Sequence, residues 1–328
     1  YLYPMKAYVE DFPNQILNAL QRCDEQTEIH PKTFNCIIIA GMGGSGICGM
    51  IFNDLYKNNI TCPVIPLQNY DLPAFVNHES LVILCSYSGN TEETLSVFQQ
   101  AIERQSYCIA MCSGGILAKR AKELQIPCYS MPTGQPPRAS IAYPFVFICD
   151  IFTKLGLLKD TYAELKNLSI FLKSETTELK SLAFDIAKTC LHSLPILYGF
   201  GLTEGVLIRC RQQINENSKM LCWHHMFPEM NHNELVGWAE QQPHSVVLAF
   251  HTAFDVTRNI KRFEFCKPIF ESRCKAVLNL YAKGHTALEQ SFYLILLGDW
   301  ISCYLADLKA IDPTEVRVID GLKAFLNS

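Results

Sequence analysis

The sequence predicts an α/β protein with two doubly wound parallel sheets, and two observations support this fold class. Short continuous apolar runs alternate with longer segments of helical period, which is typical of parallel strands covered by helices on both faces. The order of strand, turn and helix also occurs twice along the 328 residues. A chain of this length commonly forms two domains, so we expect the two halves to share one architecture.

The first half contains three apolar runs that we predict to be buried strands, at residues 36–40, 81–85 and 108–112. Each run is followed by small or polar residues and then by a segment of helical period, at residues 47–56, 91–104 and 116–124. This βαβαβ series predicts a doubly wound sheet.

The second half repeats the plan with predicted strands at residues 195–198, 245–250 and 276–281, and with helices at residues 204–220 and 287–308. The order of strands, turns and helices repeats, but few residues are identical between the halves. We place the boundary at the start of the polar stretch 154–180, which gives a first domain of residues 1–153 and a second of residues 154–328.

Composition excludes several classes of protein. The net charge is −4 and no block of Lys or Arg occurs, so we expect no nucleic-acid partner. The longest apolar runs, such as residues 292–297, are far shorter than the ~20 residues that cross a bilayer, so we expect no membrane partner. The fifteen cysteines form no CxxC pair, and many lie in apolar runs. We therefore predict a cytoplasmic protein with reduced core cysteines.

The first predicted strand is followed by Gly41-Met-Gly-Gly-Ser-Gly46. Glycines let the backbone approach a ligand, and the following helix offers free N–H groups to an anion. The segment also matches the G-x-G-x-x-G pattern of dinucleotide sites, which needs an acidic residue ~20 positions further on. The nearest candidate, Asp71, lies too far along the chain and in a loop-like segment. A tight structural turn is the other alternative.

The second predicted strand ends in Ser86-Tyr-Ser-Gly-Asn-Thr91, and a predicted helix follows. One Ser or Thr at this position is a common helix cap. Three hydroxyls within six residues exceed the need for a cap, and with the exposed helix N–H groups they indicate a phosphate site without a metal.

These two loops resemble those of the sugar isomerase (SIS) domain. Three further motifs resemble the bifunctional phosphoglucose/phosphomannose isomerase family: Pro136-Pro-Arg138, Asn215-Glu-Asn-Ser-Lys219 and Pro228-Glu-Met-Asn-His-Asn-Glu234. The resemblance implies two SIS-type, Rossmann-like domains and a homodimer with shared active sites. It implies interconversion of glucose 6-phosphate and mannose 6-phosphate with fructose 6-phosphate, and no cofactor or metal. The substrate-binding residues that it implies are Gly44, Ser45, Ser86, Ser88, Thr91 and Arg138.

The implied reaction moves a proton between carbons 1 and 2 of the sugar through an enediolate, which requires one carboxylate base. By resemblance this base is Glu216, although a lone helix glutamate is usually only solvated. His232 matches the histidine that opens the sugar ring, and Lys323 matches a lysine that assists it, with Lys309 as a nearby competitor. Arg138 matches the cation that faces the negative enediolate.

Three alternatives stay open at this point. His224, His225, Glu229 and His232 could ligate zinc. A non-catalytic SIS protein could bind a sugar phosphate and regulate another process, but it would not need Glu216, His232 and Lys323 together. A dinucleotide-binding oxidoreductase is the third. We also predict that the aromatic and Met-rich segment 223–228 is a loop in a dimer interface, with His232 reaching the other chain's site.

Overall fold

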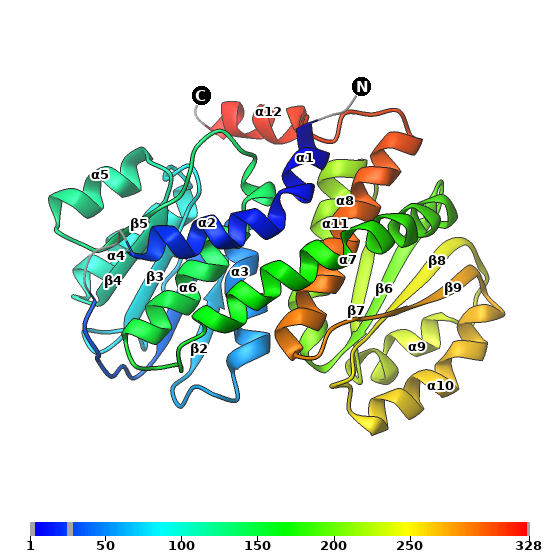
Figure 1. Ribbon diagram of the computed structural model, residues 1–328. Helices are drawn as coiled ribbons and strands as arrows, with labels where there is room; N and C mark the ends of the chain where they lie inside the picture. Colours follow the sequence, from blue (N-terminus) through cyan, green and yellow to red (C-terminus); the bar gives the residue numbers. More distant parts are fainter. Residues whose placement is uncertain (1–3, 25–28, 327–328) are drawn as a thin grey trace.

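The computed structural model describes residues 4–24 and 29–326, and it contains two parallel sheets (Figure 1). The first sheet has the strand order β2-β1-β3-β4-β5. Its strands are β1 (Ile37–Gly41), β2 (Val64–Leu67), β3 (Leu81–Cys85), β4 (Tyr107–Cys112) and β5 (Cys128–Ser130). The second sheet has the order β7-β6-β8-β9. Its strands are β6 (Leu194–Phe200), β7 (Trp223–Phe227), β8 (Gln242–His251) and β9 (Cys274–Tyr281). All neighbouring strands pair in parallel.

The α-helices surround these sheets. Those up to the end of α7 are α1 (Pro4–Glu10), α2 (Phe12–Asp24), α3 (Gly43–Tyr56), α4 (Glu92–Glu103), α5 (Gly115–Glu123), α6 (Ala142–Lys154) and α7 (Tyr162–Cys190). Those that follow are α8 (Glu204–Ser218), α9 (Glu234–Gly237), α10 (Thr257–Glu271), α11 (Ala287–Leu308) and α12 (Arg317–Leu326). The described residues also form three short 3₁₀ helices, η1 (Pro137–Ala139), η2 (Gly201–Thr203) and η3 (Glu229–His232).

Side chains that alternate along the strands enter different helix layers, as the pleat of a strand requires. In β1, Ile37 and Ile39 belong to a core that also contains residues of α2, α3 and α6. The intervening Ile38 and Ala40 belong to a second core that contains residues of α4 and α5. The second sheet is covered in the same way, by α7, α8 and α11 on one face and by α10 on the other.

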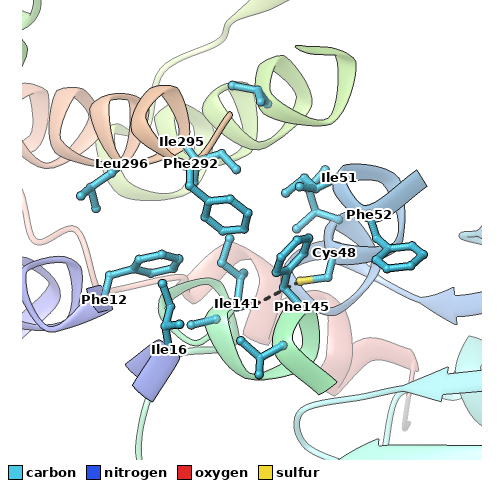
Figure 2. Packing of buried hydrophobic residues seen from close by; sticks show 14 of the residues in the cluster. Phe12, Ile16, Cys48, Ile51, Phe52, Ile141, Phe145, Phe292, Ile295 and Leu296 are labelled. Carbon is cyan, nitrogen blue, oxygen red and sulfur yellow. Dashed lines mark hydrogen bonds between the residues drawn. The ribbon is translucent and has the colours of Figure 1, made fainter. Parts of the chain in front are cut away.

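One inner layer of helices joins the two halves (Figure 2). Phe292 of α11 packs against Phe145 of α6 with ring centroids 4.6 Å apart, and against Phe12 of α2 at 5.9 Å. Helix α3 meets the start of α8 closely, because a Cβ on Gly205 would lie 3.0 Å from the backbone nitrogen of Ile51. The two sheets are therefore held on a common core.

The structure confirms the α/β class and the two doubly wound parallel sheets. Every strand that the sequence predicts is present within a few residues of its expected bounds, but β2, β5 and β7 were not predicted. The expectation that residues 223–228 form a loop is wrong, because Trp223–Phe227 is strand β7, paired with β6 at the sheet edge. The division into residues 1–153 and 154–328 stays a prediction.

Two features of composition have a structural explanation. All fifteen cysteines lie within the described residues, and most of them are buried. Helix α11 is long and apolar enough to cross a bilayer, but 83% of its most apolar window is buried inside the protein. It packs against α7 and α8, as a core helix does.

Candidate active site

The candidate site lies where β1, β3 and β4 end, since the carboxyl ends of parallel strands meet at one edge of the sheet. After β1, helix α3 starts at Gly43 without a side-chain cap, so its first N–H groups are open to an anion. Gly44 packs directly on the segment that contains Arg138. A Cβ on Gly44 would lie 3.0 Å from the Arg138 Cα, a contact that favours glycine here.

The loop after β3 is organised by its own hydroxyls. The Oγ of Ser86 and the Oγ1 of Thr91 are 2.8 Å apart, and the Ser86 Oγ also accepts from the Gly89 N–H at 3.1 Å. Ser45, from the first loop, accepts from the Tyr87 N–H at 3.1 Å. Ser45 and Ser86 are buried, whereas Ser88 is exposed. The buried hydroxyls therefore fix the loop, and the Ser88 hydroxyl faces outward.

The same loop packs tightly on the third loop, between β4 and α5. Gly89 has a φ of +70°, and a Cβ there would lie 1.8 Å from the Gly114 carbonyl oxygen, so only glycine fits. Thr91 precedes α4 but makes no capping bond with its side chain. The first N–H groups of α4 therefore also lack a side-chain cap, and two open helix N-termini adjoin the loop.

Arg138, in η1, is buried at this edge and has four oxygen partners. Its Nε donates to Asn217 Oδ1 at 2.8 Å, and its Nη2 donates to the carbonyl oxygens of Pro313 at 2.7 Å and Thr314 at 3.2 Å. Its Nη1 lies 3.1 Å from Oε2 of Glu216. Burial lowers the pKa of Arg138, while the Glu216 carboxylate acts in the opposite direction.

Glu216 reaches Arg138 because α8 runs back from the second sheet to the first. The helix starts beside Ile51, near the end of α3, and its fifteen residues span ~22 Å. Its last turn therefore lies beside the start of α3. The Glu216 side chain is 29% exposed, so the carboxylate is ion-paired and still accessible.

A buried network holds the backbone of Arg138 in place. Arg209 of α8 donates from Nη2 to the Arg138 carbonyl oxygen at 2.8 Å and to Asp299 Oδ2 of α11 at 2.7 Å. Both partners of this ion pair are 2% exposed. Burial raises the pKa of Asp299, and the Arg209 guanidinium opposes that rise. Asn217 in turn donates to Ser302 Oγ of α11 at 2.9 Å.

The arrangement combines an anion-binding edge with a carboxylate and a fixed cation. The open helix N-termini can hold a phosphate, while Arg138 can stabilise negative charge that develops beside Glu216. Such a site suits proton transfer on a phosphorylated substrate.

Comparison with known proteins identifies the family. Residues 179–326 match the family model "Bacterial phospho-glucose isomerase C-terminal SIS domain". The chain is 36% identical to a bifunctional phosphoglucose/phosphomannose isomerase of Caldicellulosiruptor bescii, with 96% of each protein covered. The chain belongs to the bifunctional phosphoglucose/phosphomannose isomerase family. It is therefore an isomerase.

Further matches agree with this assignment. A bifunctional phosphoglucose/phosphomannose isomerase of Aquifex aeolicus is 36% identical over 88% of this chain and 89% of that protein. Among solved structures, the C-terminal domain of glucosamine-fructose-6-phosphate aminotransferase from Francisella tularensis matches with a TM-score of 0.76 and 15% identity, over 96% of this chain and 99% of that one. The second likeness shows the fold alone.

The family motifs also singled out His232 and Lys323, and neither is joined to this edge by a hydrogen bond or ion pair in the part of the chain that the structure describes. His232 ends η3, which follows β7 at the carboxyl edge of the second sheet, where α8 begins rather than ends. Lys323 lies on α12 and is exposed. Within residues 4–24 and 29–326, neither side chain has a hydrogen bond or ion pair.

The histidine-rich motif forms a hydrogen-bonded network around Glu234. His225 Nδ1 and Trp223 Nε1 lie 2.6 and 2.9 Å from Glu234 Oε2, and the Tyr198 hydroxyl donates to the other carboxylate oxygen. Burial lowers the pKa of His224 to about 4. In the described part of the chain, no group of three or more His, Cys, Asp or Glu side chains is placed to hold a metal.

Sequence reasoning missed several residues that build the site. Asn217 and Lys219 stand in the quoted Asn-Glu-Asn-Ser-Lys motif, but the sequence predicted no role for Lys219 and no contact of Asn217 with Arg138. Arg209 and Asp299 lie in helical segments with no motif, and only the tertiary packing of α8 on α11 brings them together.

Proposed function

We propose that this chain interconverts glucose 6-phosphate and mannose 6-phosphate with fructose 6-phosphate, and that Glu216 moves the proton between carbons 1 and 2. The observation that supports this most directly is the 3.1 Å contact between Arg138 and Glu216 at the edge that also carries the hydroxyl loop. The named relatives act on these substrate types, which agrees with the proposal.

In the proposed mechanism, the substrate phosphate binds at the loop of Ser86, Ser88 and Thr91, together with Gly44 and Ser45. Glu216 takes the proton from one carbon and returns it to the other, so one carboxylate serves both half-reactions. Arg138 stabilises the enediolate, and because its guanidinium is already fixed, little reorganisation is needed as charge develops. The enediolate is planar at carbon 2, which is why one base can serve both epimers.

Ring opening requires a further proton donor and acceptor, for which we propose His232 with help from Lys323. The ~18 Å of α8 between its first residue and Glu216 separates that carboxylate from η3, so the His232 that serves a given site comes from a second chain in this proposal. The proposal therefore includes a homodimer with shared active sites, in the cytoplasm, without a cofactor or metal.

A non-catalytic sugar-phosphate binder is the other function considered. It would use the hydroxyl loop, but it would gain nothing from a buried arginine held by Asn217 and two carbonyl oxygens to face a carboxylate. This geometry favours the enzyme.

A coupled assay of fructose 6-phosphate formation tests the proposal. We expect turnover of both glucose 6-phosphate and mannose 6-phosphate, with rates unchanged by EDTA. Lack of turnover on both substrates would contradict the proposed function. Loss of activity on chelation, restored by zinc, would contradict the metal-free mechanism and favour the histidine cluster.

A further inference from the structure

The carboxyl end of α8, directly beyond Glu216, is covered by two lysine ammonium groups. Lys219 Nζ donates to the carbonyl oxygen of Glu216 at 2.7 Å. Lys309 Nζ, at the end of α11, donates to the carbonyl oxygens of Ser218 at 2.7 Å and Lys219 at 3.3 Å. Three of the carbonyl groups at this helix end therefore have a cationic partner.

Glu216 lies in the last turn of α8, so the charge on the carbonyl groups at this helix end acts on its carboxylate. The last carbonyl groups of a helix have no partner within it, and they carry a partial negative charge. A carboxylate in the last turn is repelled by that charge. Glu216 is such a carboxylate, two residues from the end of α8 at Ser218. Cations placed on the carbonyls offset the repulsion.

Lys219 also links this helix end to the segment that holds Arg138. Its Nζ donates to the carbonyl oxygen of Asp312 at 2.9 Å and lies 3.4 Å from that of Pro313. The Pro313 carbonyl is also the acceptor for Arg138 Nη2 at 2.7 Å. One lysine thus contacts the backbone of the predicted base and the backbone that fixes its cationic partner.

We infer that Lys219 and Lys309 are positioning residues for the isomerase reaction: they cap the carboxyl end of α8 and so keep Glu216 oriented beside Arg138. This inference rests on the proposed function of Glu216. It also gives Lys309 a role other than ring opening, since its ammonium group is directed at the helix end.

The charged groups around Lys219 are of both signs. Arg138 is a second cation, while Glu216, Asp312 and Glu315 are carboxylates within electrostatic reach. Burial and then Arg138 lower the pKa of Lys219, and the three carboxylates oppose this. Burial likewise lowers the pKa of Lys309.

The backbone conformation at Lys219 allows its side chain to be removed without strain. The residue has φ 51° and ψ 46°, a left-handed conformation that glycine adopts without strain. Gln105, Gln125 and Ala310 also have a positive φ, of 54–57°, at other helix ends, so the backbone alone is no sign of function. Replacing Lys219 by glycine therefore removes the ammonium group without straining the fold. Gln125→Gly, at the end of α5, is the matched control.

We expect Lys219→Gly to lower kcat ~10-fold, to change KM less than twofold and to shift the acid limb of the kcat/KM profile upward by about half a pH unit. The melting temperature should stay within a few degrees of that of the Gln125→Gly control, which shows that the fold is intact. Lys219→Arg should restore most of the activity, since it keeps a cation there. Lys309→Met should shift the acid limb in the same direction.

Two results would overturn the inference: Lys219→Gly with wild-type kcat and pH profile, or a loss of activity that Lys219→Arg does not restore. Glu216→Gln, assayed in parallel, separates this inference from the proposed function. If Glu216→Gln is inactive while Lys219→Gly is unaffected, only the inference fails. If Glu216→Gln stays active, the proposed function fails and the inference with it.

Discussion

The carboxyl edges of the two sheets have the same layout but different side chains. At the first edge, hydroxyls of Ser45, Ser86 and Thr91 surround helix N-termini that lack side-chain caps. At the second edge, His251 stacks between Phe200 at 5.0 Å and Tyr281 at 4.9 Å. The residues that precede the helices also differ in polarity. The hydroxyl residue Thr91 precedes α4, whereas the exposed, apolar Val256 precedes α10.

The fold determines where the loops lie, and the individual residues determine whether a loop can bind an anion. A doubly wound sheet places strand-to-helix loops at one edge in both halves. Helix N-termini without a side-chain cap occur at both edges, but the first edge adds the hydroxyl loop, Arg138 and Glu216. The second edge is filled with aromatic rings and contributes the segment that contains His232. In this account, one edge binds the substrate and the other supplies a side chain to a partner's site.

Apart from substitution of Glu216 itself, replacement of Arg138 should have the largest effect on turnover. Arg138→Met removes the cation beside Glu216, and we expect kcat to fall ~10²–10³-fold because a fixed donor to developing charge is lost. Steady-state kinetics on both sugar phosphates measures this. The Asn217 and carbonyl partners stay in place, so circular dichroism should show an intact fold. A variant with near wild-type kcat would place the chemistry away from the first edge.

Mixing inactive chains tests whether the second edge of one chain serves the first edge of another. Glu216→Gln and His232→Ala chains are dissociated, mixed and reassociated. Random pairing makes half the dimers mixed, and each mixed dimer holds one intact site, so we expect activity in roughly a quarter of the sites. If heterodimers form and no activity returns, each site is built within one chain and the two-edge account is wrong.

The phosphate loop should affect binding more than turnover. We expect Ser88→Ala and Thr91→Ala each to raise KM several-fold, up to ~10-fold, with kcat little changed, because phosphate is held similarly in the ground and transition states. Thr257→Ala, at the start of α10 on the second edge, is the matched control and should leave KM unchanged. Reduced kcat with unchanged KM for the first-edge variants would mean that the phosphate binds elsewhere.

The junction between the halves should show a smaller effect, on stability rather than activity. Asp54 of α3 accepts from the Gly205 N–H at the start of α8 at 2.8 Å. Burial raises the pKa of Asp54 from 3.8 to about 6, so the folded protein binds this proton more tightly than the unfolded chain. The stability contributed by this proton is full below about pH 4 and is lost as pH rises through about 6.

Asp54→Asn is neutral at every pH and can still accept from Gly205. Between pH 4 and pH 7 we expect wild type to lose ~2 kcal/mol more of its unfolding free energy than this variant. Urea denaturation at the two pH values measures the difference. An equal loss of unfolding free energy in the two proteins would show that folding does not raise the pKa of Asp54.

Strong apolar runs made much of this fold predictable from sequence. The central strands β1, β3 and β4 are continuous apolar segments followed by glycine or serine turns, which few other structures produce. Strand β2 contains a proline and β5 has three residues, so neither has enough periodicity to be recognised. Strand β7 has two adjacent histidines and lies at an edge, where burial imposes little pattern.

The candidate site was predictable to the extent that motifs marked it. Motifs singled out Arg138 and Glu216, and the structure places them 3.1 Å apart. The groups that hold them come from distant segments, such as Asp299 on α11 and the carbonyl of Pro313. Backbone carbonyls have no sequence signal, and a buried ion pair between two helices appears only once the helices are packed.

Exchange of the substrate's carbon-2 hydrogen with solvent reports directly on the base that removes this hydrogen. We expect the wild-type enzyme to exchange it in heavy water, observed by proton NMR of the sugar phosphate. Glu216→Gln should still bind substrate but lose exchange and turnover by ~10²–10⁴, the usual contribution of a positioned general base. Exchange at the wild-type rate in Glu216→Gln would show that another group is the base and would contradict the proposed role of Glu216.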